Sequence, residues 1–138
     1  MKYWINTIAK DHVMVGKKEG FVQAAHGKKA PVEKLETDDY IIFYSPKTSL
    51  QNGKPVRAFT AVAKIKERDV YQVIISDTFQ PYRKDAEYEP CQEVAIKPLI
   101  EQLNFITNKK YWGLRFRSGL FEIDRHDFDL IYRLMMTS

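Results

Sequence analysis

Two strand-like segments in the middle of the chain determine what kind of fold it can adopt. Residues 40–44 form a continuous apolar run, Tyr-Ile-Ile-Phe-Tyr, directly after a turn signal at residues 37–39. Residues 57–66 alternate instead, with Ala58, Thr60, Val62 and Lys64 on one face and Phe59, Ala61, Ala63 and Ile65 on the other. We therefore expect a central strand and a second long strand, joined by a loop over residues 45–56 that is rich in turn residues.

The remaining segments are short, and most of them are also strand-like. Strands are expected at residues 3–8, 21–23, 70–75, 82–91, 94–96 and 114–123. Short helices are expected at residues 12–18, 31–35, 100–105, 108–112 and 127–135, the first capped by Asp11 and ended by Gly20, the last capped by Asp124 or Asp127. Long parallel βαβ units are absent from this pattern. It predicts one α+β domain over residues 1–138, with a curved sheet or pseudo-barrel, short peripheral helices and a mouth framed by loops.

Composition narrows the class of partner only slightly. The 138 residues include 22 Lys and Arg against 18 Asp and Glu, which gives a formal net charge of +4. A mildly basic chain favours anionic partners such as nucleic acid, although many proteins of this charge bind none. The single Cys91 rules out an internal disulfide framework, so a reducing cytoplasm is the expected location. The chain has no signal-peptide pattern and no apolar run of membrane-spanning length, so we expect no membrane association.

Catalytic patterns are not found. Cys91 has no neighbouring positive charge, and the serines lie outside any nucleophile-elbow pattern. The glycines lack the spacing of a phosphate-binding loop. The histidines at 12, 26 and 126 are too widely spaced to indicate a metal site, and the sequence favours simple exposed or capping roles for His12 and His126. We therefore expect no catalytic residue, no metal and no cofactor.

Four segments combine aromatic, amide and basic side chains in a way that suits a nucleotide. Strand alternation places Trp4 and Asn6 on one face, a ring for stacking beside an amide for a base edge. Residues 23–31 bring two lysines to the start of a predicted helix, which favours an anion. Residues 43–48 end a buried strand with an aromatic, a hydroxyl and a cation. Residues 115–123 add a basic and aromatic patch. Each segment also has an ordinary structural explanation, as core, solvated turn or salt-bridged surface.

Taken in order along the chain, five segments resemble the EVE domain family. They are Tyr3-Trp4-Ile5-Asn6, Gly20-Phe21-Val22-Gln23, His26-Gly27-Lys28-Lys29-Ala30-Pro31, residues 39–47 and residues 116–123. The resemblance covers essentially the whole chain. It implies a PUA-like fold, related to the YTH and ASCH domains, and binding of nucleic acid or a modified nucleotide rather than turnover. Related domains place a flipped or single-stranded base in an aromatic pocket and hold the flanking phosphates with basic residues.

The resemblance also assigns roles to individual residues. The base pocket would be lined or rimmed by Trp4, Asn6, Gln23, Tyr44, Ser45, Pro46, Lys47 and Phe121. Phosphates would be bound by His26, Gly27, Lys28, Lys29, Arg83 and Arg117. No local cluster of three aromatics is present, so the pocket must be assembled from distant strands, with Trp4 and Tyr44 facing each other. Which modification is read, and whether DNA or RNA carries it, stays open, and a nuclease or processing role would need a separate effector protein.

Two other functions are compatible with these residues. The first is an ASCH-like hydrolase of modified nucleosides, for which Lys47 would need to meet a carboxylate, Glu33 or Glu122, in the pocket. The second is a sensor of a free nucleotide or small metabolite. Salt dependence separates strand binding, which weakens steeply with salt, from binding of a neutral nucleoside.

Overall fold

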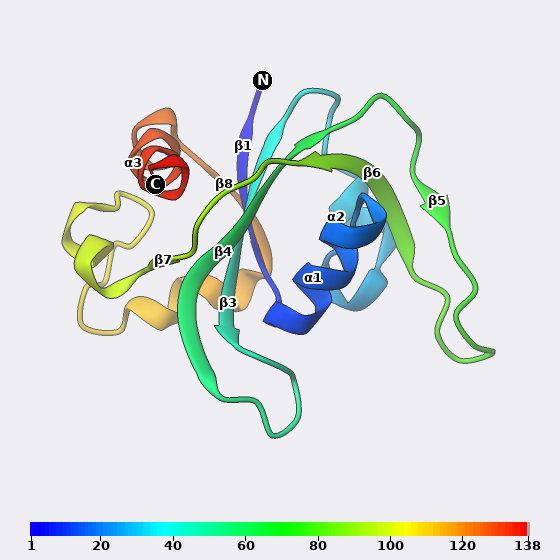
Figure 1. Ribbon diagram of the computed structural model, residues 1–138, viewed down its shortest axis with the longest axis horizontal. Coiled ribbons are helices and arrows are strands. Elements are labelled where there is room, and N and C mark those ends of the chain that lie inside the picture. Colours follow the sequence, from blue (N-terminus) through cyan, green and yellow to red (C-terminus); the bar gives the residue numbers. More distant parts are fainter. Residues whose placement is uncertain (138) are drawn as a thin grey trace.

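The computed structural model describes residues 1–137, and its main element is a curled mixed sheet (Figure 1). The hydrogen-bonded strand order is β2-β6-β4-β3-β1-β8, with β5 paired to β6 and β7 paired to β4. The strands are β1 (Tyr3–Thr7), β2 (Phe21–Val22), β3 (Tyr40–Lys47), β4 (Pro55–Ile65), β5 (Tyr71–Gln72), β6 (Tyr82–Tyr88), β7 (Val94–Ala95) and β8 (Leu120–Ile123). The pair β1 and β3 is parallel, and the other pairs are antiparallel.

Short helices cover both faces of this sheet. They are α1 (Lys10–Glu19), η1 (Ala25–Gly27), α2 (Lys29–Glu33), η2 (Lys97–Gln102), η3 (Trp112–Ser118) and α3 (Arg125–Met136), where η marks a 3₁₀ helix. Figure 1 shows α1 and α2 inside the curl of the sheet, between β3 and β6, and α3 on the other side. No helix among residues 1–137 is long and apolar enough to cross a bilayer.

The two faces bury separate cores because strand alternation sends neighbouring residues to opposite sides. Ile41 and Phe43 of β3 pack with Val13 of α1 and Val32 of α2. Ile42 and its neighbours on the other face pack with η3 and α3, in the cluster Ile5, Ile42, Tyr44, Phe59, Val62, Phe116, Phe121, Phe128 and Ile131. The predicted architecture, an α+β curved sheet with short peripheral helices, is therefore confirmed.

The strict alternation predicted for the second long strand is wrong at one point. Phe59 and Val62 both contact the α3 side, whereas Ala61 lies on the α1 side. The register explains this: Phe43 pairs with Ala61 and Tyr44 pairs with Phe59, so Thr60 is the extra residue of a β-bulge. A bulge reverses which face the following residues occupy.

The start of the predicted loop at residues 45–56 is also corrected, because β3 continues through Pro46 to Lys47. The ladder is irregular between Ser45 and Lys47. A proline, which has no backbone N–H to donate, is tolerated at such an irregularity. The extension carries Pro46 and Lys47 to the end of the sheet.

Residues 114–118 were expected to be extended, and this is wrong. They belong to η3, in which Trp112 and Phe116 lie on one side of the helical turn with their rings 6.3 Å apart. Phe116 also stacks on Tyr44 at 3.9 Å. Burial of these rings in one cluster favours the helical turn, and the strand begins only at Leu120.

Two of the predicted helix ends are confirmed, and two predicted helix starts are wrong. Gly20 ends α1 at a φ of 79°, and Asp124 caps α3 by accepting a hydrogen bond from the Asp127 amide at 2.8 Å, as expected. Asp11 does not cap α1, because that helix starts earlier, with Ala9 at its N-cap. The second helix starts at Lys29 rather than at Pro31.

Gly16 allows α1 to pack closely on β2. A Cβ atom there would lie 2.8 Å from the Phe21 carbonyl oxygen and 2.8 Å from the Tyr88 hydroxyl. Gly16→Ala should therefore lower the free energy of unfolding by about 1–2 kcal/mol, although alanine is the better helix former. The matched control is Gly113→Ala, whose Cβ meets no atom within 4 Å. Urea unfolding checks both, and a Gly16→Ala variant as stable as the wild type would contradict this packing.

Candidate functional site

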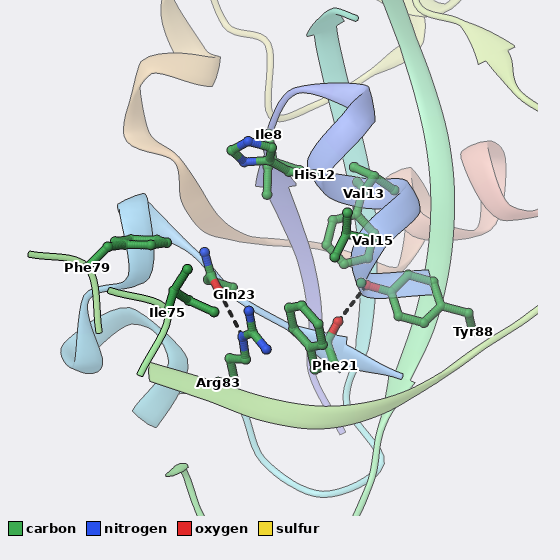
Figure 2. Close-up of a pocket in the computed structure, with 12 residues that line it drawn as sticks. Ile8, His12, Val13, Val15, Phe21, Gln23, Ile75, Phe79, Arg83 and Tyr88 are labelled. Carbon is green, nitrogen blue, oxygen red and sulfur yellow. Dashed lines mark hydrogen bonds between the residues drawn. The ribbon is translucent and has the colours of Figure 1, made fainter. Parts of the chain in front are cut away.

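Two adjoining cavities lie where the parallel strands β1 and β3 end. The large cavity has a volume of about 520 Å³ and the small cavity about 180 Å³. They share Ile8, His12, Gln23 and Phe79 in their walls, so they are neighbouring parts of one hollow. The large cavity is lined by Thr7, Ile8, Ala9, His12, Gln23, Ala24, Ala25, His26, Pro46, Lys47, Ser49, Leu50, Phe79, Phe116, Arg117, Ser118 and Gly119. The small one is lined by Ile8, His12, Val13, Val15, Gly16, Phe21, Gln23, Phe43, Ile75, Phe79, Arg83 and Tyr88 (Figure 2).

The topology explains why these walls come together. Since β1 and β3 run in the same direction, Thr7 and Tyr44 are paired and both strands leave the sheet on the same side. The chain then enters α1 after Ala9 and a loop after Lys47. The end of η3 closes the third side, where the Thr7 amide donates to the Gly119 carbonyl at 2.8 Å. Crevices at the carboxyl ends of parallel strands are common ligand sites.

The charge of the hollow has one sign. Neither cavity is lined by an Asp or a Glu, whereas Lys47, Arg83 and Arg117 contribute cations and His12 and His26 contribute imidazoles. Among residues 1–137, none of these three cations is within ion-pair distance of a carboxylate. A concave site with unopposed positive charge attracts anions.

The small cavity is walled by flat rings. Tyr88 lies parallel to Phe43 with centroids 5.5 Å apart, and its hydroxyl donates to the Phe21 carbonyl at 2.8 Å. Burial raises the pKa of Tyr88, so the hydroxyl stays a donor. The Arg83 guanidinium carbon lies 3.7 Å from the centre of the Phe21 ring. Phe79 closes the opposite side, as Figure 2 shows. These surfaces suit a planar ligand.

The polar groups of the hollow are held in fixed orientations. The Gln23 Oε1 accepts from Arg83 Nε at 3.1 Å, which leaves its Nε2 as a donor between the two cavities (Figure 2). Asn6 Nδ2 donates to the Gln23 carbonyl at 3.0 Å. Asn6 Oδ1 and Thr7 Oγ1 are buried and have no hydrogen-bond partner among residues 1–137. Buried polar atoms without partners are uncommon, and these two lie next to the hollow without being exposed to it.

Several residues expected at the site do line the hollow. Gln23, Pro46 and Lys47 from the predicted base pocket contact the large cavity. So do His26 and Arg117 from the predicted phosphate site, while Arg83 lines the small cavity. Asn6 lies against Gln23 without reaching either lining.

The expected facing of Trp4 and Tyr44 does not occur. Trp4 pairs with Ile41 in register, so it lies on the α1 side of the sheet, where its Nε1 donates to Asp39 Oδ2 at 3.0 Å. Tyr44 lies on the opposite face and stacks on Phe116. The two side chains are 6% and 2% exposed, and neither lines a cavity. Burial raises the pKa of Tyr44 to about 12, only partly offset by the charge of Arg57.

The other predicted residues lie outside the linings of both cavities. Ser45 is buried and shares a 2.8 Å hydrogen bond with Thr60, and Phe121 packs in the core beneath the Arg115 guanidinium. Gly27, at a φ of 86°, packs against Pro81, where an added Cβ would clash.

The two predicted lysines next to Gly27 also lie outside both cavities. Lys28 and Lys29 are exposed at the start of the five-residue α2. Lys29 lies 5.7 Å from the centre of the Tyr82 ring. Their positive charges therefore belong to the surface around the hollow rather than to its walls.

Sequence reasoning missed three residues that line both cavities: Ile8, His12 and Phe79. His12 was assigned an ordinary surface role, but α1 starts directly after β1 and carries His12 over the hollow. Phe79 belongs to the hairpin between β5 and β6, held by hydrogen bonds from Val73 to Pro81 and from Ile75 to Phe79. Ile75 and Phe79 stay 55% and 39% exposed. The sequence signal for this hairpin was the set of turn residues 76–78 with apolar residues on both sides.

Neither of the two pairs that hydrolysis would require, Lys47 with Glu33 or Lys47 with Glu122, comes together in the hollow. Glu33 is exposed on α2, and Glu122 is exposed on β8 opposite Trp4, so neither lines the hollow with Lys47. Burial, the largest influence, raises the pKa of the Cys91 thiol, which disfavours the reactive thiolate. The cluster of Asp124, His126 and Asp127 is structural, because Asp124 caps α3 and the buried Asp127 accepts the amides of residues 104 and 105.

Known proteins resemble this chain in sequence and in fold. The EVE domain model matches residues 2–134. A UPF0310 protein of Mycolicibacterium gilvum is 45% identical over 98% of this chain and 96% of its own, and the UPF0310 protein YdcG of Bacillus subtilis is 39% identical over 96% and 91%. A mutant of ZmASCH from Zymomonas mobilis superposes with a TM-score of 0.60 at 8% identity over 98% and 99% of the two chains. Rpa0253 of Rhodopseudomonas palustris gives 0.59 at 11%, over 98% and 93%. The fold is therefore ASCH-like and PUA-like, and the chain belongs to the EVE domain family.

Proposed function

We propose that this protein is a non-catalytic module that binds nucleic acid and receives one modified base in the hollow at the end of β1 and β3. The observation that carries the proposal is the charge of the hollow: Lys47, Arg83 and Arg117 line it, and no carboxylate does. An anionic ligand is favoured there over a cationic or a neutral one.

The small cavity fits the base of such a ligand better than its phosphate. Phe21, Phe43, Phe79 and Tyr88 contribute rings to its walls, and Phe79, which is 39% exposed, can stack on a base. Its volume of about 180 Å³ suits a compact flat group. The larger cavity next to it has room for the sugar and phosphate.

Gln23 is the residue suited to read the edge of the base. It lines both cavities, and Arg83 holds its Oε1, so the amide presents Nε2 as a donor to an acceptor atom of the ligand. A base with a carbonyl or ring-nitrogen acceptor fits this arrangement.

A binding module of this kind needs other components to act. Any cleavage or processing of the bound strand would come from a separate effector protein, since neither Ser49 nor Ser118 of the large cavity is hydrogen-bonded to a histidine or lysine among residues 1–137. The lone Cys91 remains consistent with a reducing cytoplasm as the place of action.

Binding to a panel of short single-stranded DNA and RNA oligonucleotides tests the proposal. Each oligonucleotide carries methylated cytosine, methylated adenine or no modification at its centre, and affinity is measured by fluorescence anisotropy at several salt concentrations. We expect one modified form to bind at least about tenfold more tightly than its unmodified counterpart, a difference of about 1.4 kcal/mol. The affinity should fall with salt at a slope of about 0.7 per phosphate contacted.

Two results would speak against the proposal. Equal affinity for every modified and unmodified strand would remove the base-reading step. Tight binding of a free nucleoside without salt dependence would instead identify a metabolite sensor.

A further inference from the structure

The segment that leads into η3, together with η3 itself, carries a second basic and aromatic surface outside the hollow. Residues 108–119 include Lys109, Lys110, Arg115 and Arg117 and contain no Asp or Glu. Over residues 1–137 these cations form no ion pair. A chain of modest net charge that concentrates positive residues in one segment creates a local site for a polyanion.

Two of these cations have structural roles. Lys109 Nζ donates to the carbonyls of Ile100 and Leu103 at 3.0 and 2.8 Å, which ties the segment before η3 to η2. Arg115 donates to Ser118 Oγ at 3.0 Å, and its guanidinium covers the Phe121 ring. Lys110 and Arg117 are exposed and have no such partner among the described residues. They are therefore available to a ligand.

An exposed ring lies beside one of the free cations. Tyr111 is 57% exposed, and the Lys110 ammonium is 5.3 Å from the centre of its ring. Beside it is a separate shallow depression of about 270 Å³ whose walls include Asn108, Tyr111, Leu114 and Arg115. An open ring with a cation at its face is a stacking platform for a nucleobase, because every base has a π face.

This depression adjoins the large cavity of the hollow. Ser118 lines both, and Arg117, the residue before it, lines the large cavity. A strand whose phosphate is bound by Arg117 can therefore continue into the neighbouring depression that Tyr111 lines. The segment 108–119, which contributes residues to both sites, contains no Asp or Glu.

We propose that the η3 surface, formed by Lys110, Tyr111 and Arg115, is a second binding site that holds the nucleotide flanking the one in the hollow. The inference rests on the proposed function and specifies the ligand: a single strand of several nucleotides, with one neighbouring base stacked on Tyr111. A free nucleotide would fill only the hollow.

The experiment compares ligands of different length. Mononucleotide, trinucleotide and hexanucleotide single strands, unmodified or carrying methylated cytosine or methylated adenine, are titrated into the wild type and into Tyr111→Ala. We expect affinity to rise with length in the wild type. Tyr111→Ala should lose about 5- to 150-fold in hexanucleotide affinity, the range found when a base-stacking ring is removed, and should bind the mononucleotide as the wild type does. The matched control Tyr111→Phe keeps the ring and should behave as the wild type.

Three outcomes would overturn the inference: wild-type hexanucleotide affinity in Tyr111→Ala, a loss in Tyr111→Phe as large as that in Tyr111→Ala, or displacement of the hexanucleotide by polyglutamate of equal charge at equal concentration. A different result would contradict the proposed function of the hollow. If reversing the charges of Lys47 and Arg117 leaves mononucleotide binding unchanged while Tyr111→Ala still weakens the hexanucleotide, the η3 surface binds a strand and the hollow does not.

Discussion

Trp4→Ala is expected to lower the free energy of unfolding by about 3–5 kcal/mol, the usual cost of truncating a large buried aromatic side chain. Trp4 is 6% exposed and packs with Ile41 and Phe43 in the core between the sheet and α1. Its removal also takes one of the donors from the buried Asp39 carboxylate. Since a domain of this size is stable by about 5–15 kcal/mol in total, thermal and urea unfolding should show a large shift.

Trp4→Phe separates the structural role of this ring from a role in recognition. Phenylalanine keeps most of the buried surface and loses only the Nε1–H donated to Asp39, which still accepts from the amides of Lys2 and Glu36. We expect a loss of about 1–2 kcal/mol in stability and no change in oligonucleotide affinity. A folded Trp4→Phe protein that had lost strand binding would restore Trp4 as a stacking residue.

Reversing the two cations of the large cavity should have the largest effect on binding. In Lys47→Glu with Arg117→Glu, two phosphate contacts are lost and negative charge is placed in a hollow that has none. We expect oligonucleotide affinity at low salt to fall by about 100-fold or more, since like charges in a concave site repel strongly. The slope of log affinity against log salt should decrease by about 1.4, at 0.7 for each phosphate of a single strand.

A control with the same change in net charge is available on α3. Arg125→Glu with Arg133→Glu also brings the formal net charge from +4 to zero, but neither residue lines a cavity. This variant should lose only the weak, long-range part of the attraction. Equal losses in the two double variants would mean that net charge, and not the hollow, determines binding.

The fold was predictable from the sequence because its long elements have strong local patterns. The apolar run at residues 40–44 and the strand that follows it form the centre of the sheet, and Gly20 and Asp124 mark helix ends as predicted. What could not be predicted was register. A single extra residue, Thr60, reverses the faces of β4, and such a bulge leaves no clear local signal.

The same limit explains which site residues were found. Lys47 and Arg117 were found because they follow strand-like or aromatic segments that end at the mouth of the sheet. The pairing of Trp4 with Tyr44 failed because it depended on the relative register of β1 and β3, which places the two on opposite faces. His12 and Phe79 reach the hollow through tertiary packing of α1 and of the β5–β6 hairpin, which alternation within one strand does not reveal.

The most direct test of the account is to map a bound strand by NMR, using the modified oligonucleotide with the highest affinity in the panel and following backbone and side-chain amide signals. We predict the largest chemical-shift changes at the Gln23 side-chain amide and at the backbone amides of Thr7, His12 and Phe79, which surround the hollow. Changes confined to α3 or to the outer face of the sheet, with the Gln23 signals unmoved, would contradict the assignment of the hollow as the base-binding site.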